Sequence, residues 1–190
     1  MGNNISDIIR NRRPTPPRFF RGEKIEREVI ELLLENGSWA PTHKQTEPWR
    51  SKGDLGESKD NLASRIFEML KQNQVFYASV NMQKAEKFTE GMNKVPVAIA
   101  IILQRDEAER IPEWEETAAV AMAVQNMWLT ATELGLGGFW TTPEFLPLIG
   151  NLIGILPSQK LLGFFYVGKV GVELPSPGRE DVALKTEWFD

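Results

Sequence analysis

The sequence predicts an α+β fold, or α/β sandwich, in which helices flank a sheet of few strands and one long helix is buried. Helical and strand-like segments alternate in the second half of the chain, and the longest helical segment is apolar on nearly all sides. The 190 residues suffice for one compact domain with its own core, and no internal repeat or low-complexity segment divides them. We therefore expect a single domain over residues 1–190.

The first half of the chain is predicted to be helical around one irregular loop. The first helix stops before Pro14, because a proline disfavours helical geometry in the preceding residue. The second has apolar side chains at helical spacing and ends at Gly37. A loop over residues 38–50 follows it. The expected helices are residues 6–13, 23–37, 57–74 and 79–94, the last with a solvated charged face.

The second half is predicted to alternate between strands and helices. The unbroken apolar run VPVAIAIILQ is typical of a buried strand. The longest helix starts with a proline and acidic residues and ends at a glycine, and its small apolar middle predicts burial in a core or an interface. The expected elements are strand 95–104, helix 112–135, strand 135–142, helix 143–152 and strand 161–171, followed by a tail that resembles an arm laid over another surface.

Composition excludes several classes of function. A net charge of −4 argues against binding nucleic acid by phosphate neutralisation. With one histidine and no cysteine, the chain has no disulfide, no thiolate metal site and no multi-histidine metal site. We find no apolar run of membrane-spanning length and no signal peptide. We therefore expect a cytoplasmic protein with no metal, membrane or nucleic-acid partner.

An arginine cluster follows the first helix. Arg10, Arg12, Arg13 and Arg18 surround a proline-rich turn, where their forked donors suit a phosphate or a carboxylate. A solvated basic face is the alternative interpretation. Arg179, in the tail, is a lone cation beside two acidic residues, for which a surface ion pair is the default.

The loop SWAPTHKQTEPWR and the segment GLGGFWTT are two further candidates. Trp39 and Trp49 offer flat apolar faces, and His43 could donate to an anion or to a ring oxygen; a histidine bonded to backbone is the alternative. The glycines of residues 135–142 allow a ligand to approach the backbone closely, or they form only a helix cap and a tight turn. Glu115 and Glu116 are adjacent, so they are interpreted as first-turn partners of the helix dipole.

Taken in order, four motifs resemble the nitroreductase family of FMN-dependent oxidoreductases, and in particular its short members with a histidine in the loop. Any one match is weak, but four in the right order with fitting spacings make a strong resemblance. The motifs are I-x-x-R-R at residues 9–13, A-P-x-H-K-x-x-x-P-W-R at residues 40–50, G-x-G-G-x-W at residues 135–140 and G-F-x-Y-x-G at residues 163–168.

The resemblance implies a mostly antiparallel sheet and a homodimer with FMN at the subunit interface, its tail, residues 172–190, exchanged with the partner. Arg12 and Arg13, with Pro14 next to them, would hold the phosphate and ribityl end. Trp39 and His43 would reach the same flavin from the other subunit. The remaining cofactor-binding residues implied in this way are Trp140, Thr141 and Thr142 along the isoalloxazine and Arg179 at the phosphate.

The implied activity is an NAD(P)H oxidoreductase that reduces nitroaromatic or quinone-like acceptors by ping-pong hydride transfer. FMN carries the redox chemistry, so no side-chain acid or base is required. Residues 131–136 correspond to a stretch sometimes assigned to the nicotinamide dinucleotide. The alternatives are a non-catalytic flavin-binding module and a dehalogenating or flavin-modifying enzyme of the same fold. No feature of the sequence identifies the acceptor or chooses between NADH and NADPH.

Three positions depart from the family pattern. Pro14 stands where many members have serine, and Thr15 could replace the lost hydroxyl. Glu47 places a carboxylate where a neutral amide is common, which would disfavour an anionic reduced flavin nearby. The polar stretch SKGDLGESKD, residues 51–60, stands where the family has an apolar strand. We expect that strand to be very short or irregular.

Overall fold

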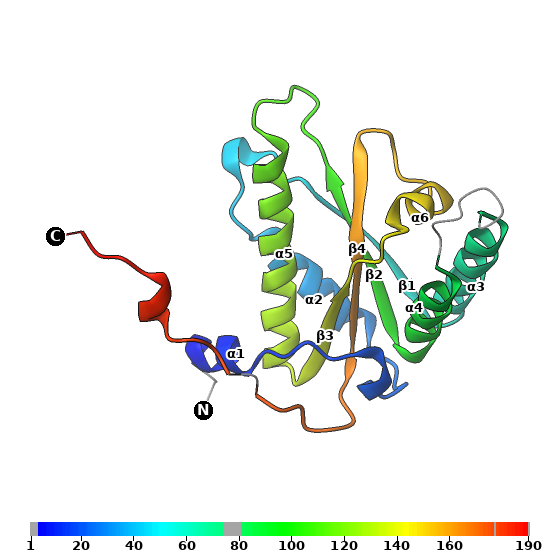
Figure 1. Cartoon of the computed structure of the whole chain (residues 1–190), viewed down its shortest axis with the longest axis horizontal. Coiled ribbons are helices and arrows are strands. Elements are labelled where there is room, and N and C mark those ends of the chain that lie inside the picture. Colours follow the sequence, from blue (N-terminus) through cyan, green and yellow to red (C-terminus); the bar gives the residue numbers. More distant parts are fainter. Residues whose placement is uncertain (1–3, 74–80, 177, 190) are drawn as a thin grey trace.

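The computed structural model describes residues 4–73, 81–176 and 178–189, and a four-stranded sheet lies at its centre. All of its pairings are antiparallel, in the order β1-β2-β4-β3. Figure 1 shows helices on both faces, which confirms the predicted sandwich. The strands are β1 (Trp49–Leu55), β2 (Val97–Gln104), β3 (Leu136–Thr141) and β4 (Gln159–Lys169), and the α-helices are α1 (Ile5–Asn11), α2 (Arg27–Ser38), α3 (Gly56–Asn73), α4 (Met82–Lys94), α5 (Glu113–Glu133) and α6 (Leu146–Leu152).

Strand β2 forms the centre of the core on both faces of the sheet. Successive side chains of a strand point to opposite faces, so an unbroken apolar run can contribute to two clusters. Val97, Ile99, Ile101 and Leu103 pack with α2 and α5. Ala98, Ala100 and Ile102 pack in the cluster that includes α3, α4 and α6. The predicted buried strand is therefore confirmed.

Helix α5 is buried along one side only. Val120, Val124 and Met127 lie in the core against the sheet and α2. Met122 and Leu134 are exposed in the single chain. The prediction that the long helix is buried thus holds for the sheet-facing side, and the other side presents small and apolar residues to solvent.

The expectation for residues 51–60 is wrong, because a regular strand forms there. Residues Trp49–Leu55 pair with β2 over their whole length, with Trp49 opposite Leu103 and Leu55 opposite Val97. Helix α3 then begins at Gly56, which adopts a positive φ of 53°. The strand tolerates lysine, aspartate and glycine because it lies at the edge of the sheet, where most of its side chains face solvent.

Other boundaries differ by a few residues from the expected ones. Asn4 caps α1 by accepting a hydrogen bond from the backbone N–H of Ser6 at 3.0 Å. Helix α2 begins at Arg27 rather than at residue 23, because Ile25 is buried in the extended segment before the helix. The expected ends of the third and fourth helices, at residues 74 and 79, lie outside the described residues.

The described part of the C-terminal arm, residues 172–176 and 178–189, leads away from the body of the molecule. Figure 1 shows it passing α1 before it extends outward. It contains one short 3-10 turn, Val182–Lys185. Its large apolar side chains are exposed: Val182, Leu184, Trp188 and Phe189. Among the described residues, no helix is long and apolar enough to cross a membrane.

Candidate functional site

Two arginines are fixed at the end of α1. Helix α1 ends at Asn11, and the chain is extended from Arg12 onward. The Arg12 guanidinium lies over the indole of Trp128, 4.5 Å from the ring centroid. Arg13 donates to the carbonyl oxygen of Arg12 at 2.9 Å and to Ser176 Oγ, on the C-terminal arm, at 2.7 Å. These contacts hold both guanidinium groups at one end of the sheet.

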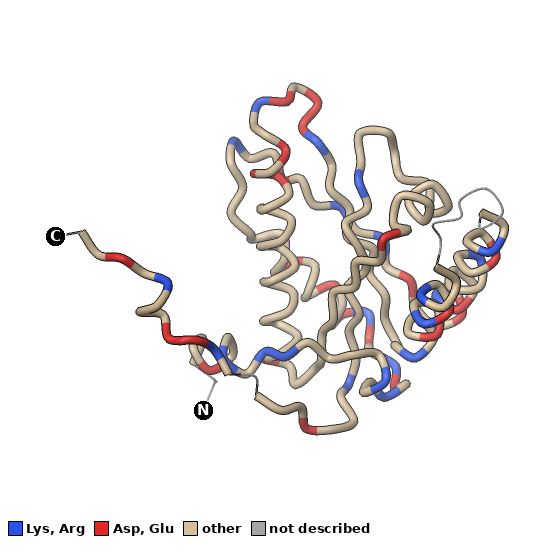
Figure 2. Tube along the Cα trace, viewed as in Figure 1, with Lys and Arg blue, Asp and Glu red and all other residues tan. Residues whose placement is uncertain are grey.

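Arg179 belongs to the same electrostatic cluster. Burial lowers the pKa of Arg12 first, and the positive charges of Arg179 and Arg13 lower it further. Figure 2 shows basic segments side by side where the end of α1 meets the arm. Three cations that repel one another would be stabilised by an anion bound among them. The structure therefore brings together the three arginines, Arg12, Arg13 and Arg179, that the family resemblance implied for the phosphate.

The segment after these arginines runs along β3. Pro14 forms a bridge with Gly138, and the backbone N–H of Thr15 donates to the Gly138 carbonyl oxygen at 2.9 Å. Trp128 Nε1 donates to the carbonyl oxygen of Arg13 at 3.2 Å. The Thr15 side chain is buried and lines a cavity.

The glycines of residues 135–142 serve the packing of the chain itself. Gly135 ends α5 with a φ of 70°. A Cβ on Gly137 would come within 2.6 Å of Thr15 Oγ1, and a Cβ on Gly138 within 2.7 Å of the Trp128 indole. The groups that approach these two glycines closely are the protein's own Thr15 and Trp128, and the expected approach of a ligand stays a prediction. Gly135, the third glycine, serves as the helix cap and turn at the end of α5.

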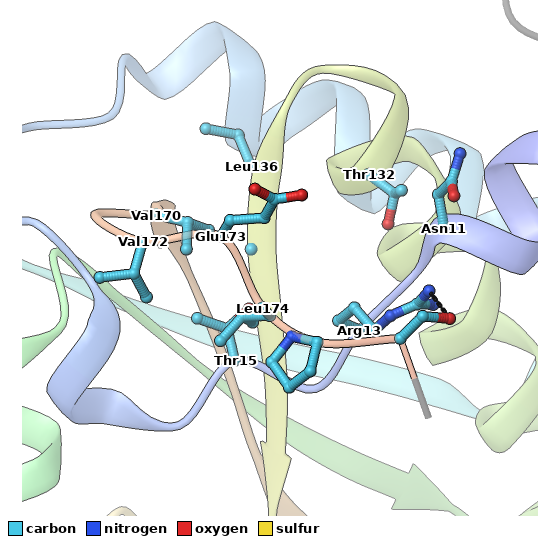
Figure 3. Close-up of a pocket in the computed structure, with 12 residues that line it drawn as sticks. Asn11, Arg13, Thr15, Thr132, Leu136, Val170, Val172, Glu173 and Leu174 are labelled. Carbon is cyan, nitrogen blue, oxygen red and sulfur yellow. Dashed lines mark hydrogen bonds between the residues drawn. The ribbon is translucent and has the colours of Figure 1, made fainter. Parts of the chain in front are cut away.

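A first cavity, of about 640 Å³, opens beside Arg13. Figure 3 shows Arg13 and Asn11 on one side of it, Val170 and Val172 on the other, and Glu173 between them. It includes part of the stretch 131–136, through Thr132 and Leu136. The remaining lining residues are Thr15, Gly137, Leu174, Pro175 and Ser176.

A second cavity, of about 550 Å³, lies between residues 16–18, α4 and β3. Apolar side chains dominate its lining, and Arg18, Lys84, Lys87 and Lys94 supply cations. Lys84 Nζ is 2.9 Å from Glu144 Oε2. The sequence interpretation of α4 as a purely solvated charged face missed this cavity, since no local pattern places α4 opposite β3. The remaining lining residues are Pro16, Pro17, Phe88, Glu90, Gly91, Phe139, Thr141, Pro143 and Tyr166.

Tyr166 contributes an unusual polar atom to the second cavity. Its side chain is 1% exposed, and its hydroxyl has no hydrogen-bond partner among the described residues. Burial raises the pKa of Tyr166, so the group stays a neutral phenol that can donate or accept. A buried hydroxyl without a partner at the wall of a cavity is suited to a polar ligand atom.

The three residues predicted along a flavin ring do not share one environment. Trp140 packs in the core on the α2 and α5 side of the sheet, and its Nε1 is buried without a partner among the described residues. Thr141 lines the second cavity on the opposite face. Thr142 follows the end of β3 and is exposed. Their backbones nevertheless form one continuous edge, because β3 is the last strand of the sheet.

His43 lies at the other end of α5, whereas Trp39 lies at the end of α2. Trp39 is the C-cap residue of α2: its backbone N–H donates to the Asn36 carbonyl oxygen at 3.3 Å, and the residue is 80% exposed. His43 Nδ1 is 2.6 Å from Glu115 Oε2, in the first turn of α5. Arg12 instead contacts Trp128, which follows Glu115 by 13 positions, about 20 Å along the helix axis. Within one chain, the predicted residues therefore form two separate groups.

The nitroreductase family model matches residues 9–169 of the chain. YfhC of Bacillus subtilis, provisionally named as an NAD(P)H nitroreductase, is 32% identical over 143 residues, which are 75% of this chain and 71% of YfhC. A nitroreductase-like protein from Bacillus cereus has a similar structure, with a TM-score of 0.86, 24% identity, and coverage of 100% of this chain and 98% of that one.

Two further solved structures share the fold and contain FMN. One is a nitroreductase from Desulfovibrio desulfuricans in complex with FMN, with a TM-score of 0.74, 22% identity and full coverage of both chains. The other is iodotyrosine deiodinase bound to FMN and 3-iodo-L-tyrosine, with a TM-score of 0.73, 20% identity, and coverage of 98% of this chain and 100% of that one. At these identities the likeness concerns the fold. The family model spans most of the chain and the topology agrees with it, so this protein belongs to the nitroreductase family.

Proposed function

We propose that this chain is one subunit of an FMN-dependent NAD(P)H oxidoreductase that reduces nitroaromatic or quinone-like acceptors. The observation that carries the proposal is the convergence of Arg12, Arg13 and Arg179 at the end of β3 that adjoins the first cavity. The FMN in the Desulfovibrio desulfuricans relative and the name of YfhC support it.

The residues present fit FMN. Three guanidinium groups with forked donors suit a dianionic phosphate, and their mutual repulsion would be relieved by it. The second cavity, about 550 Å³ and mostly apolar, has the size and lining of a site for a planar ring. The Tyr166 hydroxyl, buried without a partner among the described residues, could bond a polar atom of the ligand.

The protein's contribution is binding and orientation. When bound, FMN would supply the redox chemistry, namely hydride transfer between NAD(P)H and the acceptor. The arginines would hold the phosphate end, and the backbone at Thr141, which lines the second cavity, and at Thr142, which follows it, would bond ring atoms. Apolar side chains such as Phe139 and Phe88 exclude water from the second cavity. No side chain of this arrangement needs to act as a general acid or base.

The same proposal includes a homodimer. His43 contacts Glu115, and Arg12 contacts Trp128, about 20 Å further along the axis of α5, so a second copy would be needed to bring His43 and Trp39 to the same flavin. The exposed apolar residues of the arm, among them Leu184 and Trp188, and the open side of α5 offer surfaces that a partner would bury. Light scattering coupled to gel filtration should give twice the 21.5 kDa chain mass; a monomer that holds FMN would contradict the shared site.

The primary test is a visible spectrum of the purified protein, recorded without oxygen before and after addition of NADH or NADPH. A flavin spectrum that bleaches supports a reducible FMN. A flavin that does not bleach with either nucleotide favours a non-catalytic binding module. A colourless protein that also fails to take up added FMN would overturn the proposal.

Two substitutions test the assigned residues. Arg12→Ala and His43→Ala should each lower flavin occupancy, because one removes a phosphate donor and the other a contact from the partner. Arg10→Ala, at an exposed arginine in the last turn of α1, two residues before Arg12, is the matched control and should keep full occupancy. Full occupancy in both Arg12→Ala and His43→Ala would refute the assignment.

A dehalogenating reaction is the second candidate, favoured by the structural similarity to iodotyrosine deiodinase. Both reactions begin from reduced flavin, so the choice of acceptor separates them. Anaerobic reoxidation of the reduced protein by nitrobenzoate, menadione or 3-iodo-L-tyrosine should be fastest with one of the first two. Reoxidation by iodotyrosine alone, with release of iodide, would favour the second candidate.

A further inference from the structure

We infer that Glu115 is a positioning residue: its carboxylate keeps a proton on Nδ1 of His43 and fixes the conformation in which the loop over residues 38–50 presents that ring. The inference deepens the proposed function, on which its consequence for the flavin rests. The sequence alone gave Glu115 only the role of a first-turn acid.

The contact between the two side chains is short and directional. His43 Nδ1 lies 2.6 Å from Glu115 Oε2, and the two side chains are 57% and 25% exposed. At neutral pH a carboxylate only accepts hydrogen bonds, so Nδ1 must carry a proton whether the imidazole is neutral or charged. In the neutral ring this places the lone pair on Nε2, the edge that is left for a ligand.

Glu115 sits on a firmly held part of α5. It lies in the first turn of that helix, where the helix dipole favours negative charge. The adjacent Glu116 is fully buried, forms an ion pair with Arg105 and accepts from the backbone N–H of Asp106 at 2.9 Å. Neighbouring acids thus have different tasks: Glu116 secures the first turn, and Glu115 projects from it toward the loop.

The loop needs such a tether because its backbone is strained. Lys44, Gln45 and Glu47 are non-glycine residues with positive φ values of 52°, 53° and 42°. Each such conformation costs energy and persists only where the surroundings hold it. Lys44 Nζ donates to the Arg110 carbonyl oxygen at 3.0 Å, next to the start of α5. Two contacts therefore hold the strained loop against the same end of the helix.

An incidental surface ion pair is the competing explanation, and such pairs contribute little. Replacement of Glu115 by glutamine distinguishes the positioning role from an incidental ion pair. Glutamine keeps the size and can still bond Nδ1, but its amide can donate as well as accept, so it no longer selects the proton on Nδ1. If the pair is incidental, neither Glu115→Gln nor Glu115→Ala should change which nitrogen of the His43 imidazole carries the proton.

The chain's single histidine makes the ring directly observable. In protein labelled with ¹⁵N-histidine, long-range ¹H–¹⁵N spectra of the imidazole report which nitrogen carries the proton, with no assignment needed. At a mildly alkaline pH the wild type should show Nδ1–H, and Glu115→Gln and Glu115→Ala should shift toward the Nε2–H form. Glu113→Gln, an exposed neighbour in the same turn, should match the wild type. Variant spectra identical to the wild type would overturn the inference.

Flavin binding provides the second readout. Glu115→Ala and His43→Ala should each raise the FMN dissociation constant about tenfold, and the double variant should be no weaker than either, since one acts through the other. Unchanged binding in Glu115→Ala beside weakened binding in His43→Ala would overturn the positioning role. If the wild type does not bind FMN at all, the proposed function fails, and the imidazole spectra still decide whether Glu115 fixes His43.

Discussion

The indole of Trp128 contacts two consecutive arginines in different ways: the Arg12 guanidinium lies 4.5 Å from its centroid, and its Nε1 donates to the Arg13 carbonyl oxygen at 3.2 Å. One side chain of α5 therefore contacts the Arg12 side chain and the Arg13 backbone at once. Its ring also fills the space that a Cβ on Gly138 would occupy, so that β3 and α5 are tightly packed at this point.

This relationship predicts graded effects at Trp128. Trp128→Phe keeps a ring under Arg12 but leaves the Arg13 carbonyl without its donor, which should lower the free energy of unfolding by about 1 kcal/mol. Trp128→Leu removes both contacts and should weaken FMN binding more than Trp128→Phe does. Urea unfolding and FMN titration measure the two effects. Wild-type FMN affinity in Trp128→Leu would show that the arginines are oriented without the indole.

A second prediction concerns Gly163 in β4. Its φ is 137°, and a Cβ there would collide with the carbonyl oxygen of Thr141, at the end of β3. Gly163→Ala should lower the free energy of unfolding by roughly 3 kcal/mol, because strain and overpacking add. Gly22→Ala, where a Cβ would meet nothing within 4 Å, is the control and should be close to neutral. Equal urea midpoints for the two variants would contradict the packing at Thr141.

The loop before α5 predicts a dependence of stability on pH. Hydrogen bonds from the side chain and backbone N–H of Arg110 lower the pKa of Asp106 to about 2, from an ordinary value of 3.8. A carboxylate with a depressed pKa stabilises the folded state above the unfolded-state pKa, and that contribution is lost as pH falls toward 2. The urea midpoint of the wild type should therefore exceed that of Asp106→Asn at about pH 6, and the two should converge near pH 2. A constant difference across this range would contradict the role of Arg110.

Tyr166 predicts a gain in stability. Its buried hydroxyl has no partner among the described residues, so Tyr166→Phe removes an unsatisfied polar group while it keeps the ring. In flavin-free protein the free energy of unfolding should rise by about 1 kcal/mol, and with FMN bound this gain should be smaller if the hydroxyl bonds the ligand. Thermal unfolding of both forms measures the difference. A loss of stability in the flavin-free variant would mean that the hydroxyl has a partner.

The fold was predicted correctly for those segments whose burial can be read from their own amino-acid composition. The apolar run of β2 is buried on both faces, and α5 carries the small apolar residues that its contact with the sheet requires. The prediction failed for β1, because a polar and glycine-containing strand can form at a sheet edge, and only the strand order reveals which strands are edges.

The sequence by itself determined the order of the elements apart from β1, the family resemblance and the arginines suited to a phosphate. These follow from local spacing and from the chemistry of single side chains. Only the tertiary structure decided which of those residues meet: Arg12 and Arg13 join Arg179 near one end of α5, whereas His43 joins Glu115 at the other. It also placed Lys84 and Tyr166 at one cavity. The physical reason is that these contacts join residues far apart in the chain, and the length of α5 and the pairing of β3 with residues 14–15 set their separation, which no local pattern encodes.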